Sequence, residues 1–405
     1  MTSQQAPNHR SKRMRPLWPV PVVTLSLAAA GLAGACTSHA ADRANAPAPS
    51  AMSAAPTCVD KVFDAMTGPQ RVGQLFMGAV TPSAPDRQRI RLMHQSHVGS
   101  VFLAGRSSAG TQATKSLVDS LQAQADTVAG SRVPLLVSTD QEGGHVQVLS
   151  GPGFSTIPSA LVQGSWSTSS LRSQAATWAE QLRAAGVNLN LAPVADVVPA
   201  SLGKNNAPIG GYDREFGHTA ATVTPYSNAF AAGMAQSKVL ATFKHFPGLG
   251  HVRGNTDTTA NVVDSVTTRT SSSLEPFRSG IKAGAPFVMI SSATYSRIDP
   301  NHQAVFSSVV IKDMLRKDLG FKGVVVSDDL GQAVAVKAVP PAERALNFLS
   351  AGGDLVLTIE PNQIPAMAKA VQTRMAQNPA FRDQMNQSVH RVLTAKRQAG
   401  LLTCE

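Results

Sequence analysis

Residues 323–330 read Gly323-Val324-Val325-Val326-Ser327-Asp328-Asp329-Leu330, a short valine run that ends in two carboxylates. A run this short and this uniformly apolar is typical of a strand buried on both faces. Similar runs occur along the whole chain, at residues 75–80, 98–103, 134–140, 187–194, 239–245, 287–292 and 354–359. Segments with helical spacing lie between most of these runs, including residues 170–185 and 225–236.

Eight buried strands that alternate with helices predict an α/β fold, a single (β/α)8 barrel of the TIM type. The alternative is a doubly wound open sheet, which usually has a glycine-rich nucleotide loop after its first strand. The first run here is followed by Thr81-Pro82-Ser83, which cannot cradle a phosphate. We therefore expect the barrel.

The N-terminus has the pattern of an exported protein. Residues 1–35 contain a basic region followed by an apolar stretch and are predicted to be a signal peptide. The stretch ends Leu-Ala-Gly-Ala before Cys36, which resembles a bacterial lipobox whose cysteine carries the lipid. Cleavage at Ala-Gly-Ala, giving a secreted soluble protein, is the alternative. Residues 36–57 are rich in Ala, Pro and Ser and are predicted to be a flexible tether, which leaves residues 58–405 as one domain.

The three cysteines fit this interpretation. Cys58 and Cys404 stand at the two ends of the folded region, and an exported compartment allows them to pair as a disulfide. Cys36 is then the odd thiol, for which lipidation provides a role.

Composition excludes several classes of function. The formal net charge is +11, but the bases outside the signal peptide are spread thinly, so we expect no nucleic-acid partner. Neither H-x-x-x-H nor C-x-x-C is present, so the sequence predicts no metal site and no cofactor.

Polar side chains follow several of the predicted strands. Active groups of such barrels lie where strands end, so these residues should meet at one mouth. They are Asp140, Asp196, Lys244, His245, the segment 291–295, Asp328 and Asp329. One acid of the last pair suits a nucleophile or an anchor for substrate hydroxyls, and the alternative is a cap on the following helix. Asp140 likewise could accept hydrogen bonds from sugar hydroxyls or cap a helix.

The loop at residues 249–259 follows the predicted fifth strand and is rich in glycine and polar residues. Such a loop can move over a substrate and bring a catalytic group with it. His251 and Asp257 could form an imidazole–carboxylate pair there, or both could be solvated loop residues.

Four ordered motifs together resemble glycoside hydrolase family 3, in particular its bacterial β-N-acetylglucosaminidases, over about residues 58–401. They are D-Q-E-G-G at 140–144, I-G…R-x-F-G at 209–217, K-H-F-P-G at 244–248 and S-D-D-L at 327–330. The resemblance implies that Asp328 is the nucleophile. It also implies that Asp140, Arg214, Lys244 and His245 bind the non-reducing N-acetylglucosamine (GlcNAc).

The family's mobile loop usually ends D-S-H, whereas this chain reads Asp257-Thr258-Thr259. We expect His251 to supply the imidazole acid/base, with Asp257 as its orienting partner. The expected protein is an exported, lipid-anchored, monomeric, retaining exo-β-N-acetylglucosaminidase that acts on GlcNAc–MurNAc fragments of peptidoglycan during cell-wall turnover. One alternative is phosphorolysis by the same covalent mechanism, because an imidazole does not repel phosphate. The other, which Thr259 favours, is a catalytically inactive glycan-binding lipoprotein.

Overall fold

The computed structural model describes residues 57–403. Contacts divide the chain into residues 1–54 and 55–405, and only the second unit is described here. The predicted signal peptide, most of the predicted tether, Cys36 and Cys404 lie outside the described residues. Thr57, the last residue of the predicted tether, caps the first helix, because its side chain accepts a hydrogen bond from the backbone N–H of Asp60.

The central feature is a sheet of eight parallel strands in the order β14-β11-β9-β8-β5-β2-β1-β15. Their bounds are β1 Phe76–Val80, β2 Ser100–Leu103, β5 Leu136–Thr139, β8 Leu189–Asn190, β9 Leu240–Phe246, β11 Phe287–Ile290, β14 Val324–Ser327 and β15 Val356–Thr358. The backbone N–H of Ser327 donates to the carbonyl oxygen of Leu355 at 3.0 Å, so the two outermost strands meet. The predicted barrel is confirmed: seven of the eight predicted runs contain one of its strands, and the run at 239–245 overlaps β9, which ends one residue later at Phe246.

Successive residues of the barrel strands face opposite sides, as strand geometry requires. Val324 and Val326 of β14 face the barrel interior, whereas Val325 packs against the surrounding helices. In β11, Met289 faces inward and Val288 outward. Most residues of the strands are apolar because both of these environments are closed to water.

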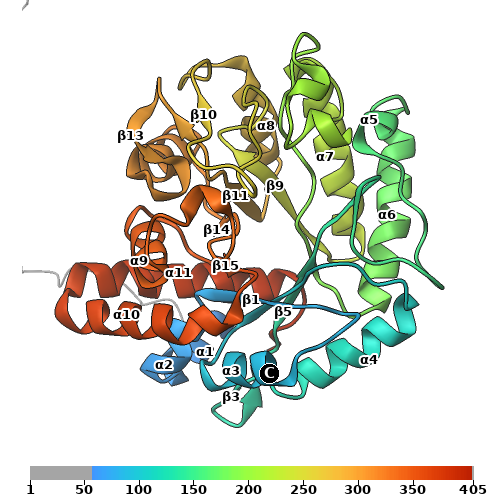
Figure 1. The fold of residues 1–405 in the computed structure, drawn as a ribbon. Helices are drawn as coiled ribbons and strands as arrows, with labels where there is room; N and C mark the ends of the chain where they lie inside the picture. The colour runs from blue at the N-terminus through green and yellow to red at the C-terminus, as the bar shows by residue number, and fades with distance from the viewer. Residues whose placement is uncertain (1–56, 404–405) are drawn as a thin grey trace, which may run out of the picture. The chain divides into compact units, whose positions relative to one another are not determined.

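Helices surround the strands (Figure 1). Their bounds are α1 Cys58–Ala65, α2 Gly68–Gly73, α3 Arg87–Gln95, α4 Gly110–Gln122, α5 Ala160–Gln163, α6 Thr168–Ala184, α7 Ala220–Gln236, α8 Glu275–Lys282, α9 Pro341–Ser350, α10 Ile364–Gln377 and α11 Pro379–Gln398, with a π-helix at Val309–Asp318. Short strands outside the barrel are β3 Thr127–Val128, β4 Ser131–Arg132, β6 Gln141–Gly143, β7 Val146–Gln147, β10 Val263–Asp264, β12 Thr294–Tyr295 and β13 Asp299–Gln303. None of the helices within residues 57–403 has both the length and the apolarity needed to cross a membrane.

Helix α7 begins earlier than the sequence pattern predicts. The pattern places its start at Pro225, but the helix begins at Ala220 because the side chain of Thr219 accepts a hydrogen bond from the backbone N–H of Thr222. Pro225 is therefore inside the helix.

The last helix, α11, closes the barrel at the end where the strands begin. Val392, Ala395 and Ala399 belong to the same apolar cluster as the inward-facing strand residues. The side chain of Lys396 is fully buried there, and its Nζ donates to Oε1 of Gln74, just before β1, at 2.6 Å. The opposite end, where the strands finish, stays open for a site.

Candidate active site

A pocket of about 420 Å³ opens at the ends of the barrel strands. Apolar side chains from the barrel interior, among them Phe102, Leu191 and Met289, form part of its lining. Its charged and imidazole-bearing lining residues are Asp140, Arg214, Lys244, His245, Asp257, Asp328, Asp329 and Lys337. Six of the seven predicted catalytic and substrate-binding residues therefore lie around one cavity, and His251 does not line it.

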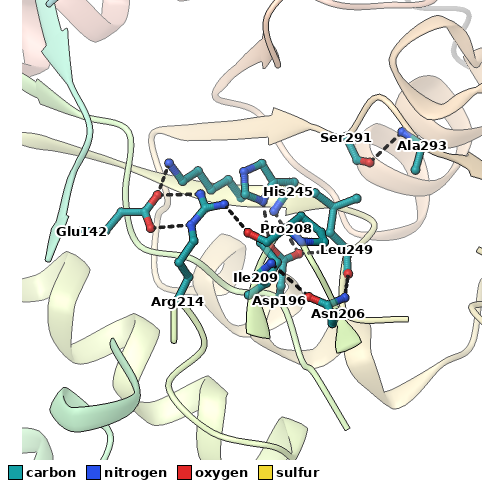
Figure 2. Close-up of polar contacts among 12 residues, drawn as sticks. Glu142, Asp196, Asn206, Pro208, Ile209, Arg214, His245, Leu249, Ser291 and Ala293 are labelled. Atoms are coloured by element: carbon teal, nitrogen blue, oxygen red, sulfur yellow. Dashed lines mark hydrogen bonds and ion pairs between the residues drawn. The ribbon is translucent and has the colours of Figure 1, made fainter. Parts of the chain in front are cut away.

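One side of the pocket is a cluster of four charged side chains, Asp140, Glu142, Arg214 and Lys244, of which Figure 2 labels Glu142 and Arg214. Arg214 donates to both carboxylate oxygens of Glu142, from Nε at 2.9 Å and from Nη2 at 2.8 Å. Lys244 Nζ lies 2.5 Å from Glu142 Oε1 and 2.6 Å from Asp140 Oδ1. Arg214 also donates from Nη1 to the carbonyl oxygen of Pro208 at 2.8 Å, which fixes the guanidinium in its plane.

Burial and charge oppose each other in this cluster. Burial alone would raise the pKa of the Glu142 carboxyl, but the adjacent charges of Arg214 and Lys244 outweigh it and lower that pKa to about 2. Burial would likewise lower the pKa of Lys244, and the carboxylates of Asp140 and Glu142 raise it above its usual value instead. Glu142 and Lys244 are therefore charged at neutral pH. Asp140, which is half-buried, exposes its carboxylate to a ligand in the pocket.

The imidazole of His245 is held from behind by Asp196. His245 Nδ1 lies 2.7 Å from Asp196 Oδ2, and Asp196 is fully buried. Asp196 Oδ1 also accepts the backbone N–H groups of His245 at 3.1 Å and Leu249 at 2.7 Å. This arrangement leaves Nε2 of His245 as the ring nitrogen available to the pocket. Lys244 and His245 both line the pocket, and the peptide bond between them is cis.

The two carboxylates after β14 have different roles. Asp329 accepts the backbone N–H groups of Gly331 and Ile359 on Oδ1 and those of Gln332 and Ala333 on Oδ2. It is therefore the capping residue of this turn. Among residues 57–403, the carboxylate of Asp328 accepts only the N–H of Asp329, at 2.9 Å, and it faces the pocket at the end of a strand. Asp328 is thus the acid of the pair that is available for chemistry.

Asp257 faces the same pocket from the loop after β9. Its carboxylate makes no hydrogen bond or ion pair to any residue in the range 57–403. Burial by the pocket walls and the nearby charge of Asp328 raise the pKa of Asp257 to about 6.

The predicted pairing of His251 with Asp257 is not formed in this structure. No hydrogen bond or ion pair joins the two side chains, and only Asp257 reaches the pocket.

Two further residues of the site were not assigned a role by the sequence pattern. Glu142 stands two positions after Asp140, and residues two apart in an extended segment share a face, so the signal was present. Asp196 was expected at the mouth, but its hydrogen bond to His245 was not, because the two residues are 49 positions apart in the sequence. Within the described part of the chain, no group of three or more His, Cys, Asp or Glu side chains is placed to hold a metal ion.

The fold and this site together define a barrel glycosidase, and comparison with known proteins agrees. Residues 69–395 match the family model described as the glycosyl hydrolase family 3 N-terminal domain. The chain therefore belongs to glycosyl hydrolase family 3 and is a glycoside hydrolase.

Proteins that this chain resembles are similar to it over most of their length. A β-hexosaminidase of Stenotrophomonas maltophilia (strain K279a) is 33% identical over 315 residues, which cover 76% of this chain and 89% of that protein. The crystal structure of a β-N-acetylhexosaminidase from Beutenbergia cavernae DSM 12333 is 49% identical with a TM-score of 0.80, over 82% of this chain and 99% of that one. The family 3 β-N-acetylglucosaminidase of Paenibacillus sp. str. FPU-7 is 28% identical with a TM-score of 0.75, over 84% of this chain and 64% of that one.

Proposed function

We propose that the protein is a retaining exo-β-N-acetylglucosaminidase that removes terminal non-reducing GlcNAc from GlcNAc–MurNAc fragments of peptidoglycan. The observation that carries the proposal is the placement of Asp328. Its carboxylate ends a buried strand and faces a pocket that also holds a second acid with a raised pKa, Asp257. Two carboxyl groups that line one small pocket suit glycoside hydrolysis through a covalent intermediate.

In the first step Asp328 attacks the anomeric carbon, and the bond to the leaving oxygen breaks as that oxygen takes a proton. In the second step water attacks the same carbon, loses a proton to the acid/base and releases Asp328. Two inversions at one carbon give net retention of configuration.

The charged cluster beside Asp328 suits the terminal sugar. Asp140 and Lys244 offer an acceptor and a donor, and His245 offers Nε2, so adjacent hydroxyl groups find partners of both kinds. Because Arg214 and Glu142 hold these groups in place before the sugar arrives, little reorganisation accompanies binding.

The experiment is release of chromophore from an aryl β-N-acetylglucosaminide by the wild type and by Asp328→Ala. An activated leaving group needs little protonation, so this assay isolates the nucleophile from the acid. We expect turnover that falls to background in Asp328→Ala while the circular dichroism spectrum is unchanged. Wild-type turnover no higher than that of Asp328→Ala would contradict the proposal and favour the glycan-binding alternative.

The choice of aglycone needs its own test. We expect GlcNAc–MurNAc to be cleaved with a higher kcat/KM than N,N′-diacetylchitobiose, whose second sugar is GlcNAc. An equal or reversed preference would contradict peptidoglycan as the substrate. It would not contradict β-N-acetylglucosaminidase activity.

We also propose that the enzyme is exported and held at the membrane by lipid on Cys36. The lipobox-like sequence that ends in Cys36 supports this, as does a disulfide at Cys58, which an oxidising compartment maintains. Labelling with an alkyne fatty acid should mark the wild type and not Cys36→Ser. Equal labelling of the two proteins would contradict it.

A further inference from the structure

We infer that the carboxyl group of Asp257 is itself the acid/base of the reaction, with no imidazole between it and the substrate. This inference rests on the proposed function and changes the role that the sequence pattern gives to Asp257, from orienting partner to proton donor. The two halves of the loop after β9 are held by different parts of the protein. Asn206 holds the half that contains His251, and the segment after β14 holds the half that contains Asp257.

The half that contains His251 is fixed away from the pocket. The fully buried side chain of Asn206 donates from Nδ2 to the carbonyl oxygens of Leu249 at 2.7 Å and Val252 at 2.8 Å. Figure 2 shows the side chain of Asn206 and the hydrogen bond that joins it to Leu249. The backbone at Gly250 packs so closely that an added Cβ would lie 1.8 Å from the carbonyl oxygen of Val197.

Moving His251 into the pocket would break buried hydrogen bonds on both sides of it. Asn206 is in turn held by the backbone N–H groups of Ile209 at 3.0 Å and Gly210 at 2.9 Å, which donate to its Oδ1. Without these partners the buried amide of Asn206 would be left with unsatisfied hydrogen-bonding groups, which destabilises the loop. Bringing the imidazole into the pocket would therefore require this segment to give up its buried hydrogen bonds.

The half that contains Asp257 is docked over the pocket. The backbone N–H of Val334 donates to the carbonyl oxygen of Asp257 at 3.1 Å, and that of Ala335 donates to Thr256 at 3.0 Å. Asn255 Oδ1 accepts the backbone N–H of Asp257 at 3.0 Å. These bonds tie the loop to the segment after β14, which also presents Asp328. The backbone of Asp257 is thus fixed, while its carboxylate is left free of protein partners among residues 57–403.

The surroundings of Asp257 raise the pKa of its carboxyl group. Burial has the largest effect, and the charges of Asp328 and Asp329 raise the pKa as well. The charges of Arg214 and His245 lower it. Lys337 lines the same pocket. The result is a pKa of about 6, against the usual 3.8. With a pKa of about 6, roughly a tenth of the Asp257 carboxyl groups are protonated at pH 7, far more than for a carboxyl with the usual value.

Asp257 can transfer the proton in both steps of the reaction. Asp257 gives its proton to the glycosidic oxygen as the bond to C1 breaks and the ester between C1 and Asp328 forms. Its carboxylate then takes a proton from water as the water oxygen bonds to C1 and the ester to Asp328 breaks. The enzyme returns to its starting state, with Asp257 protonated and Asp328 ionised.

A carboxylate acid/base has a consequence for the acceptor. After the first step Asp257 is negatively charged and repels anions, so phosphate is excluded and water is the acceptor. In phosphate buffer we expect GlcNAc as the product and no GlcNAc 1-phosphate. Formation of the sugar phosphate would overturn the inference.

The decisive test is rescue by azide. Asp257→Ala should lower kcat/KM on GlcNAc–MurNAc by about 10²–10⁴-fold, the usual contribution of a general acid. On the aryl substrate it should form the glycosyl-enzyme and then stall for want of a base. Azide is an anion, and without the negative charge of Asp257 it can enter the pocket and attack C1. It should therefore restore turnover and give β-GlcNAc azide as product. Asp119→Asn, on the exposed face of α4, is the matched control for loss of a carboxylate and should behave as wild type.

The competing variant is His251→Asn. The inference expects it to keep kcat/KM on GlcNAc–MurNAc within about twofold of wild type, with the same decline in kcat/KM above pH 6. A loss comparable to that of Asp257→Ala would overturn it, as would an Asp257→Ala enzyme that azide does not accelerate. Failure of the proposed function looks different, because the wild type itself would then not turn over the aryl substrate.

Discussion

The guanidinium of Arg214 and the carboxylate of Glu142 form two parallel hydrogen bonds, of 2.9 Å and 2.8 Å, although the two residues are 72 positions apart in the sequence. Glu142 is 4% exposed and also receives the ammonium of Lys244. One carboxylate thus neutralises two cations that face the sugar pocket. Removing its charge should affect both folding and binding.

Glu142→Gln should lower the free energy of unfolding by about 3–5 kcal/mol, because it leaves buried cations without their counter-charge. It should also raise KM for the aryl substrate, since Lys244 and Arg214 lose the group that positions them. Urea denaturation and initial rates measure the two effects. Glu343→Gln, an exposed change on α9, is the control. Equal unfolding midpoints for Glu142→Gln and Glu343→Gln would refute the prediction.

Asp196→Asn should reduce kcat/KM by about 10–100-fold, the equivalent of one charge-assisted hydrogen bond. The carboxylate accepts from the His245 ring and from two backbone N–H groups, and an amide has only one oxygen to offer them. The ring of His245 should therefore lose its orientation. The double variant Asp196→Asn/His245→Asn should be little worse than His245→Asn alone. Additive losses would mean that Asp196 acts independently of His245.

Lys396→Met should stabilise the protein most at low pH. Burial lowers the pKa of Lys396 to about 7, although the charge of Asp126 opposes this. Between pH 7 and about 10.5 the unfolded chain therefore binds a proton that the folded chain does not, so the wild type gains stability as the pH rises. Lys396→Met lacks this dependence.

The measurement is urea denaturation of Lys396→Met and wild type at pH 6, 8 and 9.5. We expect an advantage of about 1–4 kcal/mol for the variant at pH 6 that narrows by pH 9.5. Lys369→Met, an exposed change on α10, is the control. A gap that does not change with pH would contradict the pKa assignment.

Cys58 is disulfide-bonded, and its predicted partner is Cys404. Residues 401–403 line the same cavity as Lys61 and Val62 of α1, so the chain reaches its last described residue close to Cys58. Mass spectrometry of unreduced peptides should find Cys58 joined to Cys404. Cys404→Ser should lower the free energy of unfolding by at most about 5–6 kcal/mol, because the bridge closes a loop of nearly the whole domain. A bridge between Cys58 and Cys36 would contradict this pairing.

The barrel was predictable because its signal is local. Each strand is a short apolar run, and the strand ends carry the polar groups, so Asp140, Lys244 and Asp328 could be placed at one mouth without coordinates. Glu142 shares a face with Asp140 by spacing alone, but its burial depends on Arg214, which a distant loop supplies.

The contacts that the sequence could not reveal are those set by distant segments. His251 and Asp257 lie in one loop, six positions apart, yet Asn206 holds one end of that loop and the turn after β14 holds the other. Asp328 and Asp329 are equivalent in the sequence, and only the positions of four backbone N–H groups decide which of them caps the turn. Pattern and spacing carry no information on such long-range partners.

Helix α11 closes the barrel at the end where the strands begin, and α1 packs beside it. Residues 57 and 403 therefore both lie on the side of the domain opposite the pocket. A bead or a fusion partner attached through residue 57 is therefore joined to the domain at the end away from the pocket. Glycans would then approach from the free side without passing the point of attachment, and immobilisation at this end should leave kcat/KM on a soluble disaccharide unchanged.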